Sequence, residues 1–241
     1  MKILSIGNSF SQDAHKWLHE LAKACGVDIE TVNLYIGGCS LETHHTNAEQ
    51  NNAYYRLELN GNAGTQSVSI EEALKMEKWD IVTLQQVSQF SGLPETYEPY
   101  LSSLAKLVRK RLPEAKLYFH QTWAYEMDSK HSGFANYNND QAEMYRRIQE
   151  TSERAAHAIH AELIPVGEVI QTLRETVPAF DYKNGGVSLC RDGFHLSLDY
   201  GRYAAAATWL HTMVGVGIHI TDFEGFRPEL LKKINDVVNA L

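Results

Sequence analysis

Residues 2–13 constrain the fold of this chain more than any other segment. They read K-I-L-S-I-G-N-S-F-S-Q-D. The short apolar run before Gly7 is typical of a buried strand, and a helical pattern begins near Asp13. Ser9 therefore lies where a first strand turns into a first helix. In a parallel sheet this is the carboxyl edge, where open α/β folds bind their ligands.

Ser9 has two interpretations at this turn. Backbone N–H groups near a helix N-terminus stabilise developing negative charge, which favours a nucleophilic serine. Serine is also a favoured N-cap residue, so the hydroxyl group could serve only to begin the helix. The local sequence favours neither interpretation, and the choice depends on residues near the C-terminus.

Predicted strands and helices alternate along the rest of the chain. This pattern predicts right-handed crossovers and a mainly parallel, five-stranded sheet with helices on both faces. We expect a single domain over residues 1–241, with a core over about 2–217 and a tail at 218–241 that contains a helix. Residues 40–52 and 126–139 are polar and are expected to be loops. The core strands are expected near 2–7, 29–34, 80–84, 116–120 and 163–166, with a separate hairpin formed by 54–59 and 66–70 beside the sheet. The helices are expected at 13–25, 69–76, 94–111, 141–160, 169–176, 198–214 and 228–241.

The composition excludes several classes of partner. Lys and Arg number 22 against 30 Asp and Glu, which gives a net charge of −8. An acidic surface offers no electrostatic attraction for nucleic acid or an anionic membrane, so we expect neither as a partner. The 3 cysteines include no C-x-x-C pair and are expected to be free thiols. With strand-like sequence beginning at residue 2, no signal peptide is predicted, and the expected location is cytoplasmic unless a leader has been trimmed.

A second informative motif lies near the C-terminus, in the sequence Arg191-Asp192-Gly193-Phe194-His195. Asp and His three residues apart on a loop can meet side chain to side chain. The carboxylate then holds Nδ1–H and leaves Nε2 free to accept a proton from a serine. The D-x-x-H pattern alone is common, but together with Ser9 at the first strand–helix turn it indicates a nucleophilic serine.

These motifs resemble those of the SGNH hydrolase family, also called GDSL-type esterases and lipases. That family has its nucleophile in Gly-Asp-Ser after the first strand, an oxyanion-hole Gly after the second, an Asn after the third and a late Asp-x-x-His. The resemblance covers residues 2 to about 215 in the same order and implies a flavodoxin-like three-layer α/β/α sandwich. The matching positions are Gly7-Asn8-Ser9, Gly37 or Gly38, Gln85-Gln86, and Asp192 with His195.

The resemblance implies roles for these positions. Ser9 would be the nucleophile, His195 its base and Asp192 the residue that orients His195. Two departures mark an atypical branch, because Asn8 replaces the family's Asp and Gln85-Gln86 replaces its Asn. A glutamine amide can donate to an oxyanion, so the oxyanion hole would combine Gly37 or Gly38 with Gln85 or Gln86.

Weaker candidates follow from position alone. Asn8, Trp123 and Tyr125 lie at the ligand edge of the predicted sheet and are candidate substrate-binding residues. The aromatic pair would stack on a sugar ring or, alternatively, belong to the core. His44-His45 is expected in a solvated loop, because no third metal ligand is recognisable. His15 and His19 are expected on a surface helix face, because H-K-W-L-H lacks the Glu of H-E-x-x-H. We predict no metal and no cofactor.

The sequence therefore predicts a serine esterase acting on a small-molecule ester, with an acetylated carbohydrate as the leading substrate class. One alternative is a non-catalytic, carbohydrate-binding relative whose oxyanion site has changed to Gln85-Gln86. Another is a phosphate-binding α/β protein, which the single glycine and missing lysine of the 7–9 turn disfavour.

Overall fold

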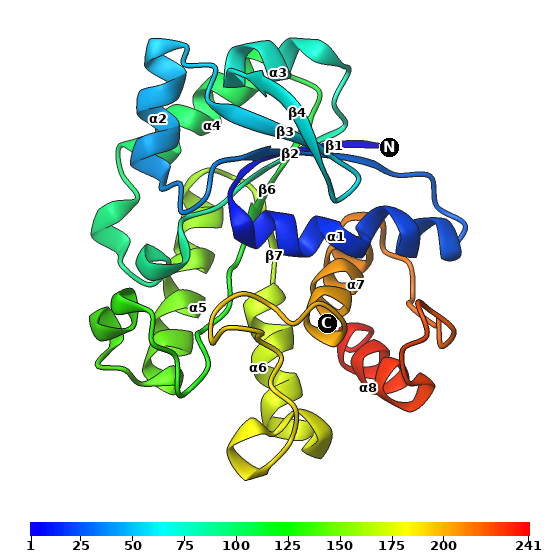
Figure 1. Ribbon diagram of the computed structural model, residues 1–241. Helices are drawn as coiled ribbons and strands as arrows, with labels where there is room; N and C mark the ends of the chain where they lie inside the picture. The colour runs from blue at the N-terminus through cyan, green and yellow to red at the C-terminus, as the bar shows by residue number, and fades with distance from the viewer.

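The computed structural model describes all 241 residues. Its helices are α1 (Ser9–Ala24), α2 (Leu41–Gln50), α3 (Ile70–Met76), α4 (Tyr100–Arg111), α5 (Gln141–Ala158), α6 (Val166–Thr176), α7 (Tyr200–Val214) and α8 (Pro228–Val238). The strands are β1 (Lys2–Gly7), β2 (Glu30–Tyr35), β3 (Tyr55–Leu59), β4 (Asn62–Val68), β5 (Ile81–Leu84), β6 (Lys116–His120) and β7 (Glu162–Ile164). The strands form one central sheet with helices on both faces (Figure 1).

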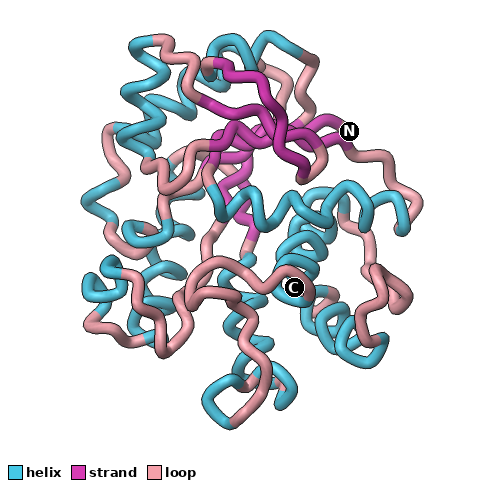
Figure 2. Tube along the Cα trace, viewed as in Figure 1, coloured by secondary structure: helices cyan, strands magenta, loops and turns pink.

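The sheet has seven strands in the order β4-β3-β2-β1-β5-β6-β7. The five predicted core strands are all present, and neighbours among them pair in parallel. Their order places β1 inside the sheet with crossovers to both sides, so the flavodoxin-like α/β/α prediction is confirmed. The tube view shows these strands gathered in the middle of the molecule, with helices around them (Figure 2).

The predicted count of five strands is too low because the hairpin β3–β4 belongs to the same sheet. β3 pairs antiparallel with β2, with Val32 opposite Leu59. Alternating polarity identifies a hairpin but does not show which strand the hairpin pairs with. It was therefore predicted to lie beside the sheet. β4 forms the outer edge, and only Val68 of that strand is buried.

Side chains of β1 alternate between two apolar layers, as strand geometry requires. Ile3 belongs to a core of 40 buried residues shared with α1, α6, α7 and α8. Leu4 and Ile6 belong to a second core of 23 buried residues shared with α2, α3 and α4. The helices thus cover opposite faces of the sheet, and the end of β1 emerges between two packed layers.

Residues 40–52 are not a loop, contrary to the sequence prediction, but contain α2. Ser40 caps this helix by accepting a hydrogen bond from the Thr43 N–H. The buried side of α2 consists of Leu41, His44 and Asn47. Because two of these three residues are polar, the spacing of apolar residues does not predict this helix.

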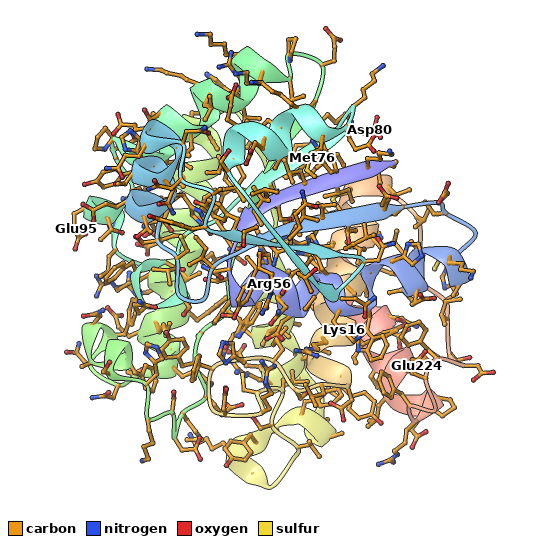
Figure 3. All side chains as sticks on the ribbon, turned by 45° about the horizontal axis from the view of Figure 1, so that its top comes forward. Lys16, Arg56, Met76, Asp80, Glu95 and Glu224 are labelled. Atoms are coloured by element: carbon orange, nitrogen blue, oxygen red, sulfur yellow. The ribbon has the colours of Figure 1, made fainter.

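The C-terminal segment packs on the larger core. The Tyr203 hydroxyl of α7 donates to Asn235 Oδ1 of α8 at 2.8 Å, and Leu231 and Ile234 are fully buried. Acidic residues such as Glu95 and Glu224 are exposed on opposite sides of the molecule (Figure 3). No helix is both long enough and apolar enough to cross a membrane.

Candidate active site

Ser9, His195 and Asp192 meet at the carboxyl end of β1. Ser9 Oγ lies 2.9 Å from His195 Nε2, and His195 Nδ1 lies 2.8 Å from Asp192 Oδ2. An ionised carboxylate only accepts hydrogen bonds, so Nδ1–H donates to Asp192 and Nε2 accepts from the Ser9 hydroxyl. This arrangement allows His195 to take the proton of Ser9.

Asp192 is held in its charged form. Partial burial would raise the pKa of this carboxyl group, but hydrogen bonds from the His195 ring and the His195 and Phe194 N–H groups outweigh it. The net effect lowers the pKa below its usual value. About 42% of the Asp192 side chain and 20% of the His195 side chain remain exposed, so the pair is open to solvent on one side.

Ser9 is not the N-cap of α1. Asn8 occupies that position, and its Oδ1 accepts from the Phe10 N–H at 3.0 Å. The Asn8 N–H in turn donates to Ser11 Oγ, which completes a capping box. α1 thus begins at Ser9, four residues earlier than expected, and the Ser9 hydroxyl group is free to contact His195.

The turn before Ser9 requires glycine at position 7. A Cβ atom on Gly7 would lie 1.9 Å from Ser11 Oγ, far inside contact distance. The same Ser11 hydroxyl donates to Asn33 Oδ1 at 2.9 Å, and Asn33 Nδ2 donates to the buried carboxylate of Glu58. Arg56, labelled in Figure 3, covers this network by pairing with Glu58 at 2.7 Å. Polar contacts from β2 and β3 thereby support the turn.

Asn8 is a structural residue and not a substrate contact, so that prediction is wrong. Its side chain is 1% exposed. Asn8 Nδ2 donates to the Cys39 carbonyl oxygen, and Asn8 Oδ1 accepts from Gln85 Nε2 at 2.7 Å. Gln85 Oε1 accepts from His120 Nδ1 at 2.9 Å. Burial, with a smaller contribution from His15, lowers the pKa of His120 to about 3, so this ring is neutral.

The predicted oxyanion residues separate into two groups. Gly37 and Gly38 are exposed in the loop after β2, and neither N–H has an acceptor within the chain. As the first residue of α1, Ser9 also carries an N–H without an intrahelical acceptor. These backbone groups are available to a developing oxyanion.

The two glutamines are buried and engaged elsewhere. Gln86 accepts from the Leu41 and Val87 N–H groups and donates to Thr96, so its assignment to the oxyanion hole is wrong. Gln85 is 1% exposed and holds Asn8 in place through its amide. Gln86 thereby joins the start of α2, the segment after β5 and Thr96. Its position after β5 does not predict this role.

Trp123 and Tyr125 are core residues, so their prediction as substrate contacts is wrong. Both are fully buried. Trp123 stacks on Phe10 at 4.2 Å, and its Nε1–H donates to the Phe194 carbonyl oxygen at 2.7 Å. The Tyr125 hydroxyl group contacts Ser88. Trp123 thereby supports the residue that precedes His195 rather than a ligand.

Asp13 is a site residue that the sequence analysis missed. Its side chain is completely buried on α1, one turn after Ser9. It accepts from Arg191 Nη1 at 3.0 Å, from Arg202 Nε at 2.8 Å and from the Leu196 N–H at 2.9 Å. One carboxylate therefore joins the helix of Ser9 to the loop of His195. The available signal was a charged residue within the buried face of the predicted helix.

The histidine pairs do not form a metal site. His15 is buried, where it contacts Ser5 Oγ at 2.8 Å, and is not on a surface face as predicted. His44 is also buried, in α2, and contacts the Tyr55 hydroxyl. Burial lowers the pKa of each ring to about 3. The structure has no cluster of three or more His, Cys, Asp or Glu residues that could hold a metal ion.

The family of this chain follows from a comparison of sequences. The profile described as Domain of unknown function (DUF4886) matches residues 2–238. The chain belongs to the DUF4886 family. A DUF4886 family protein from Bacteroides uniformis is 37% identical, with a TM-score of 0.91 over 100% of this chain and 93% of that one. No curated protein matches the sequence.

Other solved structures share the fold at low identity. One, a protein from Slackia heliotrinireducens assigned to the SGNH hydrolases, has 23% identity and a TM-score of 0.60 over 88% of this chain and 98% of that one. Another is a catalytic mutant of an acetylxylan esterase from Geobacillus stearothermophilus, with 14% identity and a TM-score of 0.54 over 88% of this chain and 94% of that one. The fold is therefore that of SGNH hydrolases.

Proposed function

We propose that this protein is a serine esterase of the SGNH type that removes acetyl groups from a carbohydrate. The observation that carries this proposal is the hydrogen-bonded series Ser9–His195–Asp192, with contacts of 2.9 and 2.8 Å. A helix cap alone would not bring a histidine and a carboxylate to Ser9 from a loop more than 180 residues away. The fold neighbours described as SGNH hydrolases and acetylxylan esterases support the reaction class.

The proposed reaction proceeds in two steps. Ser9 Oγ attacks the ester carbonyl carbon while His195 Nε2 accepts the hydroxyl proton. Collapse of the tetrahedral intermediate breaks the bond to the alcohol, which leaves with the proton from His195. Water then attacks the acyl-serine with His195 again as base, releasing the carboxylic acid and restoring Ser9. Asp192 holds the ring orientation and stabilises its charged form throughout.

Backbone N–H groups would stabilise the oxyanion. Those of Ser9 and of Gly37 or Gly38 are the candidates, because no acceptor in the chain occupies the glycine N–H groups. Each well-placed donor contributes roughly 3 kcal/mol to transition-state stabilisation. Of the two glutamines that match the family's asparagine, Gln86 is fully engaged, and buried Gln85 donates to Asn8. That observation favours the alternative of a carbohydrate-binding relative without turnover.

Hydrolysis of p-nitrophenyl acetate separates the two functions. The wild type is compared with Ser9→Ala, His195→Ala and the control Ser102→Ala, whose serine lies on the exposed side of α4. An esterase predicts turnover that falls to background in the first two variants and persists in the control. Acetate release from acetylated xylo-oligosaccharides then tests the carbohydrate assignment. Equal turnover by all four proteins would reject Ser9 as the nucleophile, and binding of the sugars without turnover would establish the alternative.

A further inference from the structure

A polar groove lies apart from Ser9, at the ends of α5 and α6. The loop after β6, the start of α5, the end of α6 and the short helix η5 (Tyr182–Asn184) enclose it. α5 and α6 run close to each other here in the lower part of the molecule (Figure 1). The groove has a volume of about 560 Å³. Small-molecule sites commonly measure roughly 300–1,000 Å³, so the groove is large enough for a sugar unit or two.

The floor of the groove contains buried polar groups with unused hydrogen-bonding capacity. Arg174, Glu126 and Gln171 line it, and each is more than nine-tenths buried. Arg174 Nη1 donates to the Ala124 carbonyl oxygen at 3.0 Å, but Arg174 Nε and Gln171 Oε1 have no partner. An unsatisfied buried polar group costs roughly 1–3 kcal/mol. Both atoms have almost no exposed surface, so a ligand that both accepts and donates would reach them only after a small shift of these side chains.

The charges of the groove disfavour an anionic ligand. Its carboxylates already have partners within the chain: Glu126 pairs with Arg174 at 3.4 Å, and Glu175 accepts from Gln171 Nε2. Asp140 and Asp181 cap α5 and η5. Lys183 and Arg174 also line the groove, so four carboxylates stand against two cations and an anion is disfavoured. Hydroxyl groups suit both the floor and the amides around it.

The rim of the groove adds apolar surface. Tyr182 is 37% exposed and Met127 is 45% exposed, and both line the groove. A polar floor beneath an exposed aromatic ring matches a sugar, which presents hydroxyl groups around its edge and C–H groups on its faces. Exposed apolar side chains that gather beside a cavity often mark a ligand-binding site.

The groove shares a wall with the loop of the catalytic residues. The Glu126 N–H donates to the Gly193 carbonyl oxygen at 2.7 Å, and Ser188 Oγ donates to Glu126 Oε2 at 2.6 Å. Gly193 lies between Asp192 and His195 in the chain. A ligand in the groove would therefore contact the residues that hold the catalytic loop.

We propose that this groove binds the non-reacting units of a neutral oligosaccharide substrate. This inference rests on the proposed carbohydrate esterase function. Binding energy gained there would act mainly on KM, because these units do not change during the reaction. Small esters that contain no sugar would not use the groove.

Isothermal titration calorimetry with xylotetraose and cellotetraose tests the proposal without requiring turnover. Tyr182→Ala removes the exposed ring, and Gln171→Met removes the amide from the floor at similar volume. Tyr54→Ala is the matched control, since Tyr54 is 68% exposed and does not line the groove. We expect at least one oligosaccharide to bind the wild type and Tyr54→Ala equally, and to bind Tyr182→Ala about tenfold more weakly, as for an interface aromatic.

The outcomes distinguish this inference from the proposed function. If neither oligosaccharide binds the wild type, or if Tyr182→Ala and Gln171→Met bind like the wild type, the groove is not a sugar site. This would hold even if p-nitrophenyl acetate is hydrolysed. If binding depends on Tyr182 while Ser9→Ala leaves hydrolysis unchanged, the groove is supported and the esterase mechanism is rejected. Thermal unfolding of each variant shows whether Gln171→Met is folded, and Tyr182→Ala decides the test if it is not.

Discussion

Asp13→Asn is expected to uncouple Ser9 from His195 while leaving the fold largely in place. The carboxylate accepts from Arg191, Arg202 and the Leu196 N–H, and it is completely buried. An asparagine keeps the shape but presents N–H groups to the two arginines in place of a second oxygen. The loop that carries His195 would then lose its main attachment to α1.

The stability lost in Asp13→Asn can be estimated from these contacts. Hydrogen bonds to charged groups contribute about 1.5–3 kcal/mol each, and breaking a buried ion pair costs about 3–5 kcal/mol. Arg191 and Arg202 are 30% and 14% exposed, so water can partly solvate them after the change. We therefore expect a loss near the lower limit, about 3 kcal/mol, which lowers Tm by about 6–12 °C for a domain of this size.

The effect on catalysis should appear in kcat. A displacement of about 1 Å in a catalytic group can cost roughly a hundredfold in rate, so we expect kcat to fall at least tenfold with little change in KM. The assay is steady-state hydrolysis of p-nitrophenyl acetate well below the Tm of each variant. Asp236→Asn is the control, because Asp236 makes only an exposed pair with Lys232. A folded Asp13→Asn protein with wild-type kcat would refute the positioning role.

Three further changes test other parts of the site. Gly7→Ala places a Cβ atom 1.9 Å from Ser11 Oγ and should cost about 1–3 kcal/mol of stability together with most activity, measured by denaturation and ester hydrolysis. Trp123→Phe removes the 2.7 Å hydrogen bond to the Phe194 carbonyl oxygen and should lower kcat more than it raises KM; a change confined to KM would contradict its supporting role. Because folding lowers the pKa of Asp192, its ionised form stabilises the protein above the unfolded pKa of about 3.9, and this stability is lost as the pH falls through the folded value. The stability difference between wild type and Asp192→Asn should therefore be present at pH 6 and should disappear at strongly acidic pH, and a difference independent of pH would count against this linkage.

The part of the site that could be predicted from sequence is local in character. Gly7 and Ser9 lie between a clear strand and a clear helix, and Asp192 and His195 are close in the chain. The direction of a parallel sheet brings both segments to the same edge. Only the meeting of Ser9 with His195 is long-range, and family resemblance supplied that step.

The errors concern the direction in which side chains point. Trp123 does follow β6 at the ligand edge, but its ring turns into the core against Phe10. Gln85-Gln86 matches the family's asparagine position, yet Gln86 binds loop backbone groups. Periodicity places a residue along an element, whereas the packing of distant segments decides which atoms its side chain contacts.

The buried polar residues were the hardest to predict. Asp13 interrupts an apolar helix face, His44 belongs to a mostly polar one, and a single sequence offers no partner for either. Their partners, Arg191 and Tyr55, lie far away or on another element. A charge within an apolar face is a useful signal, because it must find a partner when buried.

The central claim is that Ser9 is a nucleophile activated by His195. The most direct test is intact-mass and peptide analysis after treatment with a fluorophosphonate, which phosphonylates activated serines. We predict one adduct per chain, on Ser9, that is absent in Ser9→Ala and strongly slowed in His195→Ala. A folded wild-type protein that remains unlabelled, or is labelled at another serine, would contradict the account.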